Sequence, residues 1–533
     1  MPRRRAAGLL AALGTVALLV GCTVQTPGQG SRNTAATPSS SSSSSSSPTA
    51  SPSPTEVASI DFTDCTDLVN PEGAGVPASR ARNLVVSCGK LTVPRDYAKP
   101  DAGDLSLYVL KIHDDSSSDQ KPMIVNPGGP GGSSVGLAIS LAGSVSDDVM
   151  SAYDIVGVDP RGVGLSSPIT CLTDAQKDTV FAAAPDVRTA AGVAQAKSLA
   201  ATWIKGCQAA ATKDGSALGD YNTVYAARDM DRVRAALGAK ALDYVGFSYG
   251  TLLGAVYATQ FPTTVGRVVL DGAVDPSVNF QQSSETQLKG FEEAFGQFAA
   301  DCKTRPACAA MGDPATAVTA LVRTAAAGGG IAVSASGETR KATVGVVYSA
   351  VAEALYDQSS WQPLGQAIVE GQQGDGRGLL DLADRYYQRD SEGHYTNLFD
   401  AFTLVTCNDG GTTFSDAQLT AVGKDWATRY PVFGSYFAGQ LAFCNGWPAS
   451  GHPVPTTVPA KGSAPIVVIG TLNDPATPYV NTAKLAGSLG VGVVLTWRGQ
   501  GHTAYLKSDC IDTAVDAYLV SGTVPRTGTT CPA

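Results

Sequence analysis

Apolar and polar positions follow two alternating patterns through the first half of the chain. Short apolar runs predict strands at 105–112, 123–125, 153–158, 242–245 and 267–270, and a helical pattern covers 226–237. Strands that alternate with helices are typical of a mostly parallel sheet with helices on both faces. The pattern therefore predicts an α/β fold for this part of the chain.

The pattern changes to helices between about residues 274 and 460. Helical patterns cover 287–300, 315–326, 343–355 and 378–388, and apolar strands return at 466–470 and 492–497. About 475 residues are many for one compact domain and are sufficient for a core with an insertion. We therefore predict a core formed by 58–273 and 461–533, with 274–460 inserted as a helical cap over the mouth of the sheet.

The first residues have the pattern of an export signal. Three arginines precede an apolar run that ends in L-V-G-C at Cys22, which is too short to span a membrane. A small residue before this cysteine is similar to a bacterial lipobox, in which the cysteine becomes the lipid-bearing mature N-terminus. We expect a signal peptide at 1–21 and attachment to the outer face of the cell membrane through a lipid on Cys22. An ordinary secretory signal is the alternative.

The segment 22–57 is predicted to be a flexible tether. It is rich in Ser, Thr and Pro and includes an uninterrupted serine run at 39–47. Such a segment has too little apolar area to offset the entropy of ordering. The formal net charge of the chain is −9, and removal of the signal arginines would make it about −12. This charge argues against a nucleic-acid partner.

Ten cysteines remain when Cys22 is set aside, an even number for an exported chain. They are expected to be oxidised. Their order suggests local pairs: Cys65 with Cys88, Cys171 with Cys207, Cys302 with Cys308, Cys407 with Cys444, and Cys510 with Cys531. A zinc site is the competing interpretation, but the chain has no C-x-x-C and no cysteine near a histidine cluster. No metal is expected.

The sequence G-F-S-Y-G at 246–250 lies between a predicted strand and a helical pattern. Strand, sharp turn and helix around G-x-S-x-G describe a nucleophile elbow, which presents its serine above a parallel sheet. A second G-x-S-x-G contains Ser134, but a Gly- and Pro-rich loop separates it from its strand. Ser248 is therefore the predicted nucleophile, and Ser134 the alternative.

A serine nucleophile needs a base, and the base needs an orienting acid. In this fold class they follow in the order serine, acid, histidine. Asp474 comes directly after a late predicted strand, and His502 is the only histidine beyond it. Taken singly, Asp474 could be a turn residue and His502 a surface residue, but their joint order predicts a triad with Ser248.

Acyl transfer also needs hydrogen-bond donors for the developing oxyanion. One is expected to be the amide of Tyr249, the residue after the nucleophile. The other is expected in the glycine-rich loop 126–132, which follows an early strand. We favour the amide of Gly129 over the alternative of a plain Gly-Pro turn.

Four separated motifs resemble a known enzyme family. N-P-G-G-P-G-G at 126–132 looks like the H-G-G-P-G-G region of proline iminopeptidases, with Pro127 in place of His, and 159–166 is similar to their D-x-R-G-x-G-x-S turn. The other two motifs look like those of the tripeptidyl aminopeptidase branch of the α/β-hydrolases: the elbow, and D-P-A-T-P at 474–478 together with G-H at 501–502. Exported actinobacterial members often carry a lipobox and several disulfides. The resemblance implies an α/β-hydrolase fold, the triad above and hydrolysis of peptides from free N-termini.

An exopeptidase must stabilise the substrate ammonium group at a fixed distance from the nucleophile, so carboxylates are expected near the mouth of the site. By analogy with proline iminopeptidases, Glu285, Glu292 and Glu293 are the predicted residues; the alternative is a solvated helix face. The sequence thus predicts a cofactor-free aminopeptidase that acts on peptide substrates and releases tripeptides, other short peptides or amino acids through an acyl-enzyme. A carboxylesterase or lipase with the same triad is the second hypothesis, and a surface binding protein on a disabled hydrolase scaffold is the third.

Overall fold

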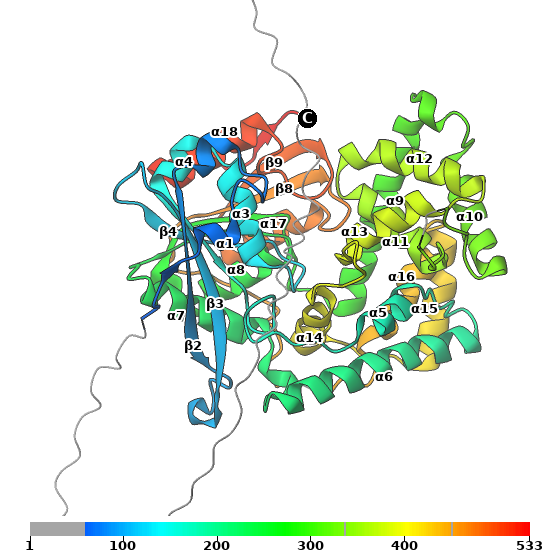
Figure 1. The fold of residues 1–533 in the computed structure, drawn as a ribbon, viewed down its shortest axis with the longest axis horizontal. Helices are drawn as coiled ribbons and strands as arrows, with labels where there is room; N and C mark the ends of the chain where they lie inside the picture. The colour runs from blue at the N-terminus through cyan, green and yellow to red at the C-terminus, as the bar shows by residue number, and fades with distance from the viewer. Residues whose placement is uncertain (1–58, 335–336, 449–450) are drawn as a thin grey trace, which may run out of the picture.

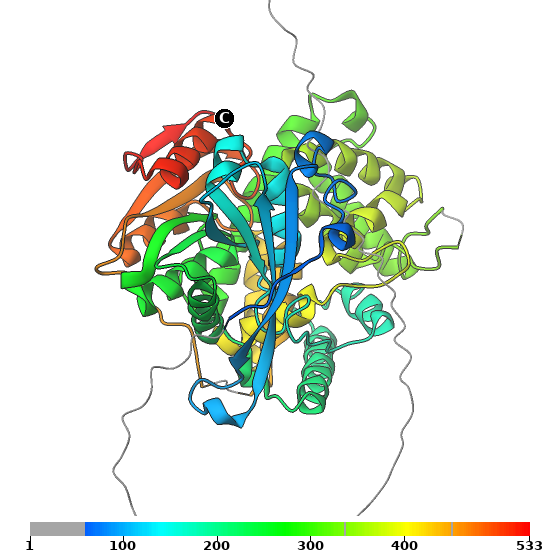
Figure 2. The ribbon, with the colours of Figure 1, turned by 60° about the vertical axis from the view of Figure 1, so that its left-hand side comes forward.

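The computed structural model describes residues 59–334, 337–448 and 451–533. The predicted signal peptide, Cys22 and the tether lie outside the described residues. Figure 1 shows two lobes, one built on a sheet and the other on helices, and Figure 2 shows the sheet lobe from a second direction. Within the described residues, no helix has the length and apolar character needed to cross a membrane.

One sheet holds the strands of the first lobe, in the order β1-β2-β3-β5-β4-β6-β7-β8-β9-β10. The strands are β1 (Thr63–Asp64), β2 (Leu84–Pro94), β3 (Asp104–Asp114), β4 (Lys121–Asn126), β5 (Tyr153–Val158), β6 (Leu242–Phe247), β7 (Val265–Asp271), β8 (Ile466–Asn473), β9 (Gly492–Gln500) and β10 (Thr529–Cys531). Pairing is antiparallel from β1 to β5 and parallel from β5 to β10. This arrangement confirms the predicted α/β fold.

Alternate residues of the central strands enter hydrophobic clusters on opposite faces, because successive side chains of a strand point to opposite sides. Tyr244 and Leu270 belong to the cluster on one face, whereas Val245 and Val269 belong to the cluster on the other. The first face is covered by α7 (Thr223–Ala236), α8 (Tyr249–Gln260) and α17 (Val480–Leu489), and the second by α3 (Ser134–Ser144), α4 (Asp147–Ala152) and α18 (Asp509–Ser521). Burial on both faces explains the nearly continuous apolar runs in these strands.

The second lobe has its own hydrophobic cluster. Its helices are α9 (Phe280–Cys302), α10 (Pro314–Gly328), α11 (Val344–Leu355), α12 (Trp361–Gln372), α13 (Arg377–Tyr387), α14 (Leu398–Gly410), α15 (Asp416–Arg429) and α16 (Gly434–Gln440). The four helices predicted between 287 and 388 correspond to α9, α10, α11 and α13. The helix α6 (Ala190–Lys213), which lies within the predicted core range, packs against both lobes: Val193 enters the cluster of this lobe, and Trp203 enters a cluster of the sheet lobe.

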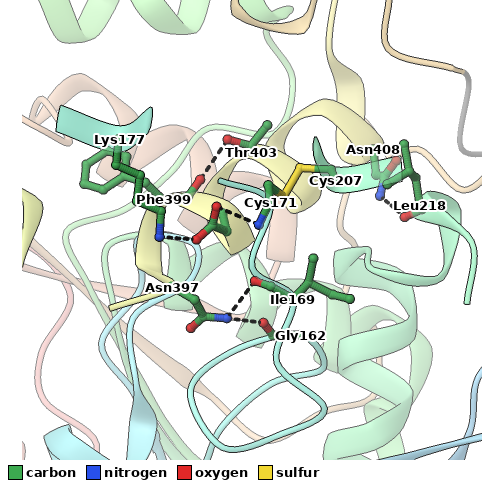
Figure 3. Close-up of a disulfide and its surroundings, with 11 residues drawn as sticks. Gly162, Ile169, Cys171, Lys177, Cys207, Leu218, Asn397, Phe399, Thr403 and Asn408 are labelled. Atoms are coloured by element: carbon green, nitrogen blue, oxygen red, sulfur yellow. Dashed lines mark hydrogen bonds and ion pairs between the residues drawn. A yellow bond between two sulfur atoms is a disulfide. The ribbon is translucent and has the colours of Figure 1, made fainter. Parts of the chain in front are cut away.

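Figure 3 shows how the start of α14 is held by the loop that follows β5. Asn397 donates from Nδ2 to the carbonyls of Gly162, at 2.7 Å, and Ile169, at 3.1 Å. Asp400 accepts from the amide of Cys171 and forms an almost fully buried ion pair with Lys177. These contacts join the helical lobe to the sheet lobe close to the Cys171–Cys207 disulfide.

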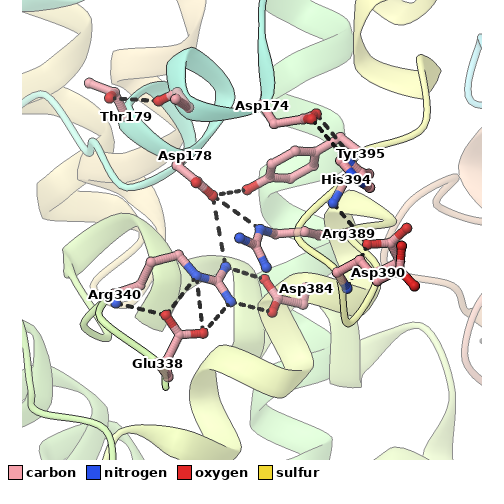
Figure 4. Close-up of polar contacts among 12 residues, drawn as sticks. Asp174, Asp178, Thr179, Glu338, Arg340, Asp384, Arg389, Asp390, His394 and Tyr395 are labelled. Carbon is pink, nitrogen blue, oxygen red and sulfur yellow. Dashed lines mark hydrogen bonds and ion pairs between the residues drawn. The ribbon is translucent and has the colours of Figure 1, made fainter. Parts of the chain in front are cut away.

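A second polar network, shown in Figure 4, joins α5 (Asp174–Phe181) to the helical lobe. The guanidinium of Arg340 lies 2.7 Å from Asp384 of α13 and 2.8 Å from Glu338. Asp178 of α5 accepts from the hydroxyl of Tyr395 at 2.7 Å. The helix α5 is therefore attached to the helical lobe although it precedes β6 in the chain.

Five disulfides are present: Cys65–Cys88, Cys171–Cys207, Cys302–Cys308, Cys407–Cys444 and Cys510–Cys531. These are the five pairs that the order of the cysteines suggested. Three of them lie within or beside the sheet lobe or its loops, and two lie among the helices of the second lobe. No group of residues suited to hold a metal ion occurs in the described part of the chain.

Candidate active site

Ser248 stands at the turn between β6 and α8, as predicted. Its backbone has φ 55° and ψ −124°, a region that non-glycine residues rarely adopt. A Cβ at Gly246 would lie 2.6 Å from the carbonyl of Gly250, and a Cβ at Gly250 would lie 2.9 Å from the carbonyl of Asn126. Both glycines are therefore required by the close packing of the turn, and the strained serine is half-buried at its tip.

Asp474 and His502 come together at the ends of β8 and β9. Nδ1 of His502 lies 2.9 Å from each carboxylate oxygen of Asp474, which is 3% exposed. Burial alone would raise the pKa of Asp474, but the charge and hydrogen bond of His502, together with bonds from Thr477, hold that pKa below its ordinary value. An ionised Asp474 keeps the proton on Nδ1 and leaves Nε2 to act as the base.

The serine elbow and the histidine both lie next to the end of β7. The amide of Ser248 donates to the carbonyl of Asp271 at 2.8 Å. A Cβ at the next residue, Gly272, would lie 3.2 Å from Cε1 of His502. The elbow and the imidazole are therefore next to the same two residues, on the edge of the sheet where parallel strands end.

The glycine-rich loop lies directly against the elbow. A Cβ at Gly128, which has φ 94°, would lie 2.9 Å from Cβ of Ser248 and 2.9 Å from the amide nitrogen of Tyr249. The amide of Gly128 already donates to Asn126. In the described part of the chain, no hydrogen bond is recorded from the amides of Gly129 and Tyr249 to another group. These two amides are suited to stabilise an oxyanion.

Ser134, the alternative nucleophile, has a different environment. It is fully buried as the first residue of α3, and its Oγ accepts a hydrogen bond from Asn126 at 3.2 Å. No strand runs directly into it. The second G-x-S-x-G motif therefore forms a loop and a helix start, and it lacks the geometry of an elbow.

The three carboxylates predicted to bind an ammonium group all have other partners. Glu285 pairs with Arg429. Glu292 accepts hydrogen bonds from the backbone amides of Val432, at 2.8 Å, and Phe433, at 2.7 Å. Glu293 is exposed and lies 3.6 Å from Lys289 on its own helix. Their role in substrate binding stays a prediction.

The end of α11 adjoins the histidine, a proximity that the sequence pattern did not predict. The ring of Tyr356 lies 5.3 Å from the His502 ring at 90°. Glu353, one helical turn earlier, has no recorded side-chain hydrogen bond or ion pair to the described residues. Burial raises the pKa of Glu353 to about 7, and the charge of Arg385 opposes this effect. Glu353 is the only carboxylate in the otherwise apolar helix α11, and this pattern was the signal in the sequence that could have indicated a functional residue.

Comparisons with known proteins identify relatives across most of the chain. A family model described as "TAP-like protein" matches residues 430–531, which contain Asp474 and His502. Serine protease Hip1 of Mycobacterium tuberculosis is 37% identical over 457 residues, which cover 83% of this chain and 87% of that protein. The chain belongs to the TAP-like family of α/β-hydrolases.

Other relatives of the chain are named for different activities. Carboxylesterase B of Mycobacterium tuberculosis is 34% identical over 83% of this chain and 86% of its own length. Tripeptidyl aminopeptidase of Streptomyces lividans is 31% identical over 89% of this chain and 87% of its own length. Among solved structures, proline iminopeptidase of Mycobacterium smegmatis matches 81% of this chain and 98% of its own, with 16% identity and a TM-score of 0.35. Family membership confirms the resemblance inferred from the motifs, and this TAP-like protein is a serine hydrolase.

Proposed function

We propose that this TAP-like hydrolase is an exported aminopeptidase that releases short peptides, tripeptides in particular, from free N-termini. The observation that carries the proposal is the Asp474–His502 pair, placed beside a strained serine elbow. The relatives named serine protease and tripeptidyl aminopeptidase support peptides as substrates. Neither a nucleic acid nor a cofactor is part of the proposal.

The geometry supports a two-step acyl transfer. The hydroxyl of Ser248 attacks the substrate carbonyl while Nε2 of His502 takes its proton, and Asp474 stabilises the imidazolium that forms. The amides of Tyr249 and Gly129 donate to the oxyanion of the tetrahedral intermediate. His502 then returns the proton to the leaving amine, and water repeats the sequence to hydrolyse the acyl-enzyme.

We propose that the helical lobe acts as a cap over this site. The cap consists of residues 274–460, as the sequence suggested, together with α5 and the first half of α6, where Val193 and Ala196 pack into the same lobe. The second half of α6 packs into the sheet lobe through Trp203 and Cys207. The cap helix α11 ends at the catalytic histidine, where Tyr356 accepts the amide hydrogen of His502. A cap in this position would limit access to chain ends and exclude the middle of a folded polypeptide.

Glu353 is our preferred partner for the substrate ammonium group. It is partly buried on α11, near Tyr356, and forms no side-chain hydrogen bond or ion pair with the described residues, although the charge of Arg385 acts on it from a distance. A carboxylate without a partner gains most from a cationic ligand, because its burial penalty is then offset by a charge. Glu285, Glu292 and Glu293 already have partners, which makes them weaker choices.

Export and lipid attachment rest on the sequence alone. The signal 1–21, the lipobox ending at Cys22 and the tether 22–57 together suggest an enzyme held at the outer face of the cell membrane. Mass spectrometry of the mature protein tests this: the expected N-terminal fragment begins at Cys22 and carries acyl chains. An unmodified N-terminus beyond Cys22 would contradict the anchor.

A carboxylesterase is the second candidate function, favoured by the relative named Carboxylesterase B. A panel of tripeptidyl amides, single aminoacyl amides, N-acetylated tripeptidyl amides and short acyl esters separates the two, with Ser248→Ala as the blank. We expect the highest kcat/KM for the free tripeptidyl amides. Efficient cleavage of esters without any cleavage of amides would favour the esterase.

A further inference from the structure

Asp271, the last residue of β7, is a buried carboxylate to which the mechanism above gives no role. It is 0% exposed. Its Oδ2 accepts the amide of Ala504 at 2.9 Å and the amide of Tyr505 at 2.8 Å. These are the second and third residues after His502, so the carboxylate is bonded directly to the loop that carries the base.

The backbone of the same residue is bonded to the nucleophile. Its carbonyl accepts the amide hydrogen of Ser248 at 2.8 Å, and the next amide, of Gly272, donates to Ile469 of β8 at 3.1 Å. Asp474 directly follows β8. Two consecutive residues at the end of β7 therefore contact the three chain segments that carry the triad.

The histidine loop contains two non-glycine residues in the left-handed region, Thr503 with φ 66° and Leu506 with φ 70°. Such residues keep this conformation only when surrounding contacts enforce it. The two amides that Asp271 binds lie between them in the chain. The carboxylate is therefore placed to hold a strained loop at a fixed distance from the elbow.

Fold stability alone does not account for a carboxylate here. In the described part of the chain, Oδ1 of Asp271 is buried without a hydrogen-bond partner, and such an oxygen lowers stability. Burial raises the pKa of Asp271 to about 6, although the hydrogen bonds from the amides of Tyr505 and Ala504 act to lower it. The titratable groups that face it are His502, whose charge favours its ionised form, and Asp474, whose charge opposes it. An ionised Asp271 in turn favours the imidazolium that forms during catalysis.

We propose that Asp271 is a positioning residue that fixes the His502 loop against the Ser248 elbow and adds a second negative charge beside the imidazolium. The proposal rests on the triad of the proposed function. It concerns the rate of acylation and is independent of whether the acyl group comes from a peptide or an ester. Substrate contacts remain unchanged, so kcat is expected to respond and KM is not.

The test compares Asp271→Asn with the matched variant Asp243→Asn. Asp243 is also a buried carboxylate that accepts a backbone amide, from Arg267, but it lies near the start of β6, at the opposite end of the parallel strands from the triad. Melting temperature, kcat, KM and the pH dependence of kcat/KM are measured for both, with a tripeptidyl amide and a short ester. Asp271→Ser is a second variant in case Asp271→Asn does not fold.

We expect Asp271→Asn to reduce kcat at least about tenfold on both substrates, with KM within threefold. The acid limb of kcat/KM should move to lower pH by about half a unit, because a negative charge that favours the imidazolium is lost. Asp243→Asn should keep kcat and the acid limb. Ser248→Ala must be inactive for the comparison to apply, so an active Ser248→Ala would contradict the proposed function instead.

Three results would overturn the inference about Asp271. The first is an unchanged kcat and acid limb in folded Asp271→Asn or Asp271→Ser. The second is an equal loss of kcat in Asp243→Asn. The third is failure of both Asp271 variants to fold while Asp243→Asn folds, which would assign the residue to stability.

Discussion

The backbone amide of His502 donates a hydrogen bond to the carbonyl of Tyr356, 2.8 Å away. The carbonyl belongs to the residue that follows α11 of the helical lobe, so the proposed base is bonded to this lobe as well as to Asp474. A Cβ at Gly501 would lie 2.6 Å from the same carbonyl, which explains a glycine before the histidine. The position of the proposed base therefore depends on how the helical lobe, our proposed cap, packs against the sheet lobe.

Replacement of Tyr356 tests this dependence. The edge-on contact of its ring with the His502 ring is of a type that contributes ~0.5–1.5 kcal/mol. Tyr356→Ala is expected to lower kcat about three- to tenfold, whereas Tyr356→Phe keeps the ring and should stay within about twofold. Steady-state kinetics with a tripeptidyl amide measures both. Equal kinetics of the Ala and Phe variants would contradict a contribution of the ring.

Asp474→Asn should retain the fold and lose most of the activity. The amide side chain can replace the carboxylate in size, but it no longer enforces the tautomer of His502 that leaves Nε2 basic. We expect kcat to fall by about 10³ to 10⁴, with little change in KM. A loss smaller than about tenfold would show that another group orients the histidine.

Glu353→Gln should weaken the binding of substrates that carry a free ammonium group. The variant is expected to raise KM for tripeptidyl amides at least about tenfold and to leave the KM of a neutral ester unchanged. Because the pKa of Glu353 is about 7, the charge is lost as the pH falls below 7. In the unmodified enzyme, KM for the amide should therefore rise from pH 8 to pH 6, and in Glu353→Gln it should be flat.

The matched control for this experiment is Glu293→Gln, which removes an exposed carboxylate on α9. Unchanged kinetics are expected for it. A raised KM in Glu293→Gln together with normal kinetics of Glu353→Gln would instead indicate that the substrate ammonium group binds at α9, as the sequence predicted.

The network around Arg340 should make the stability of the cap depend on pH. Hydrogen bonds from Arg340 lower the pKa of Glu338 to about 2 against the opposing effect of burial. A carboxylate whose pKa is lower in the folded protein adds stability that is present above its ordinary value of 4.5 and is lost as the pH falls through about 2. Glu338→Gln should therefore melt at a lower temperature than the unmodified protein at pH 7.

The expected difference corresponds to about 1 kcal/mol, since these side chains are partly exposed. The gap in melting temperature should narrow as the pH is lowered from 4.5 toward 2. Glu293→Gln, which breaks only an exposed pair, should melt normally at every pH. A gap for Glu338→Gln that persists unchanged to pH 2 would contradict the role of its charge.

The sequence was sufficient for the central strands of the sheet, from β3 to β9, and for the order of the chemical groups along the chain. Strong apolar runs located β5 and β7, and the single histidine after Asp474 left one choice of base. The strand β2 was missed because Gly89 and Lys90 interrupt its apolar pattern, and β1 and β10 are too short to show one. The Ala-rich sequence of α6 does not show that the helix packs against both lobes, through Val193 in one and Trp203 in the other.

Contacts that depend on tertiary packing could not be predicted. Asp271 resembles any turn residue after a strand, and its bonds to the amides of Ala504 and Tyr505 join segments more than 230 positions apart. Glu292 appeared to be free on a helix face, yet it binds two backbone amides from another segment. The sequence shows where a carboxylate occurs along the chain, but only the complete fold determines which group it binds.

Site-specific labelling with a fluorophosphonate tests the central claim most directly. The reagent forms a stable adduct with an activated serine, and digestion followed by mass spectrometry locates it. We expect one adduct per chain at Ser248, none in Ser248→Ala, and a normal adduct in Ser134→Ala. An adduct at Ser134, or undiminished labelling of Ser248→Ala, would contradict the assignment of Ser248 as the nucleophile and with it the proposed active site.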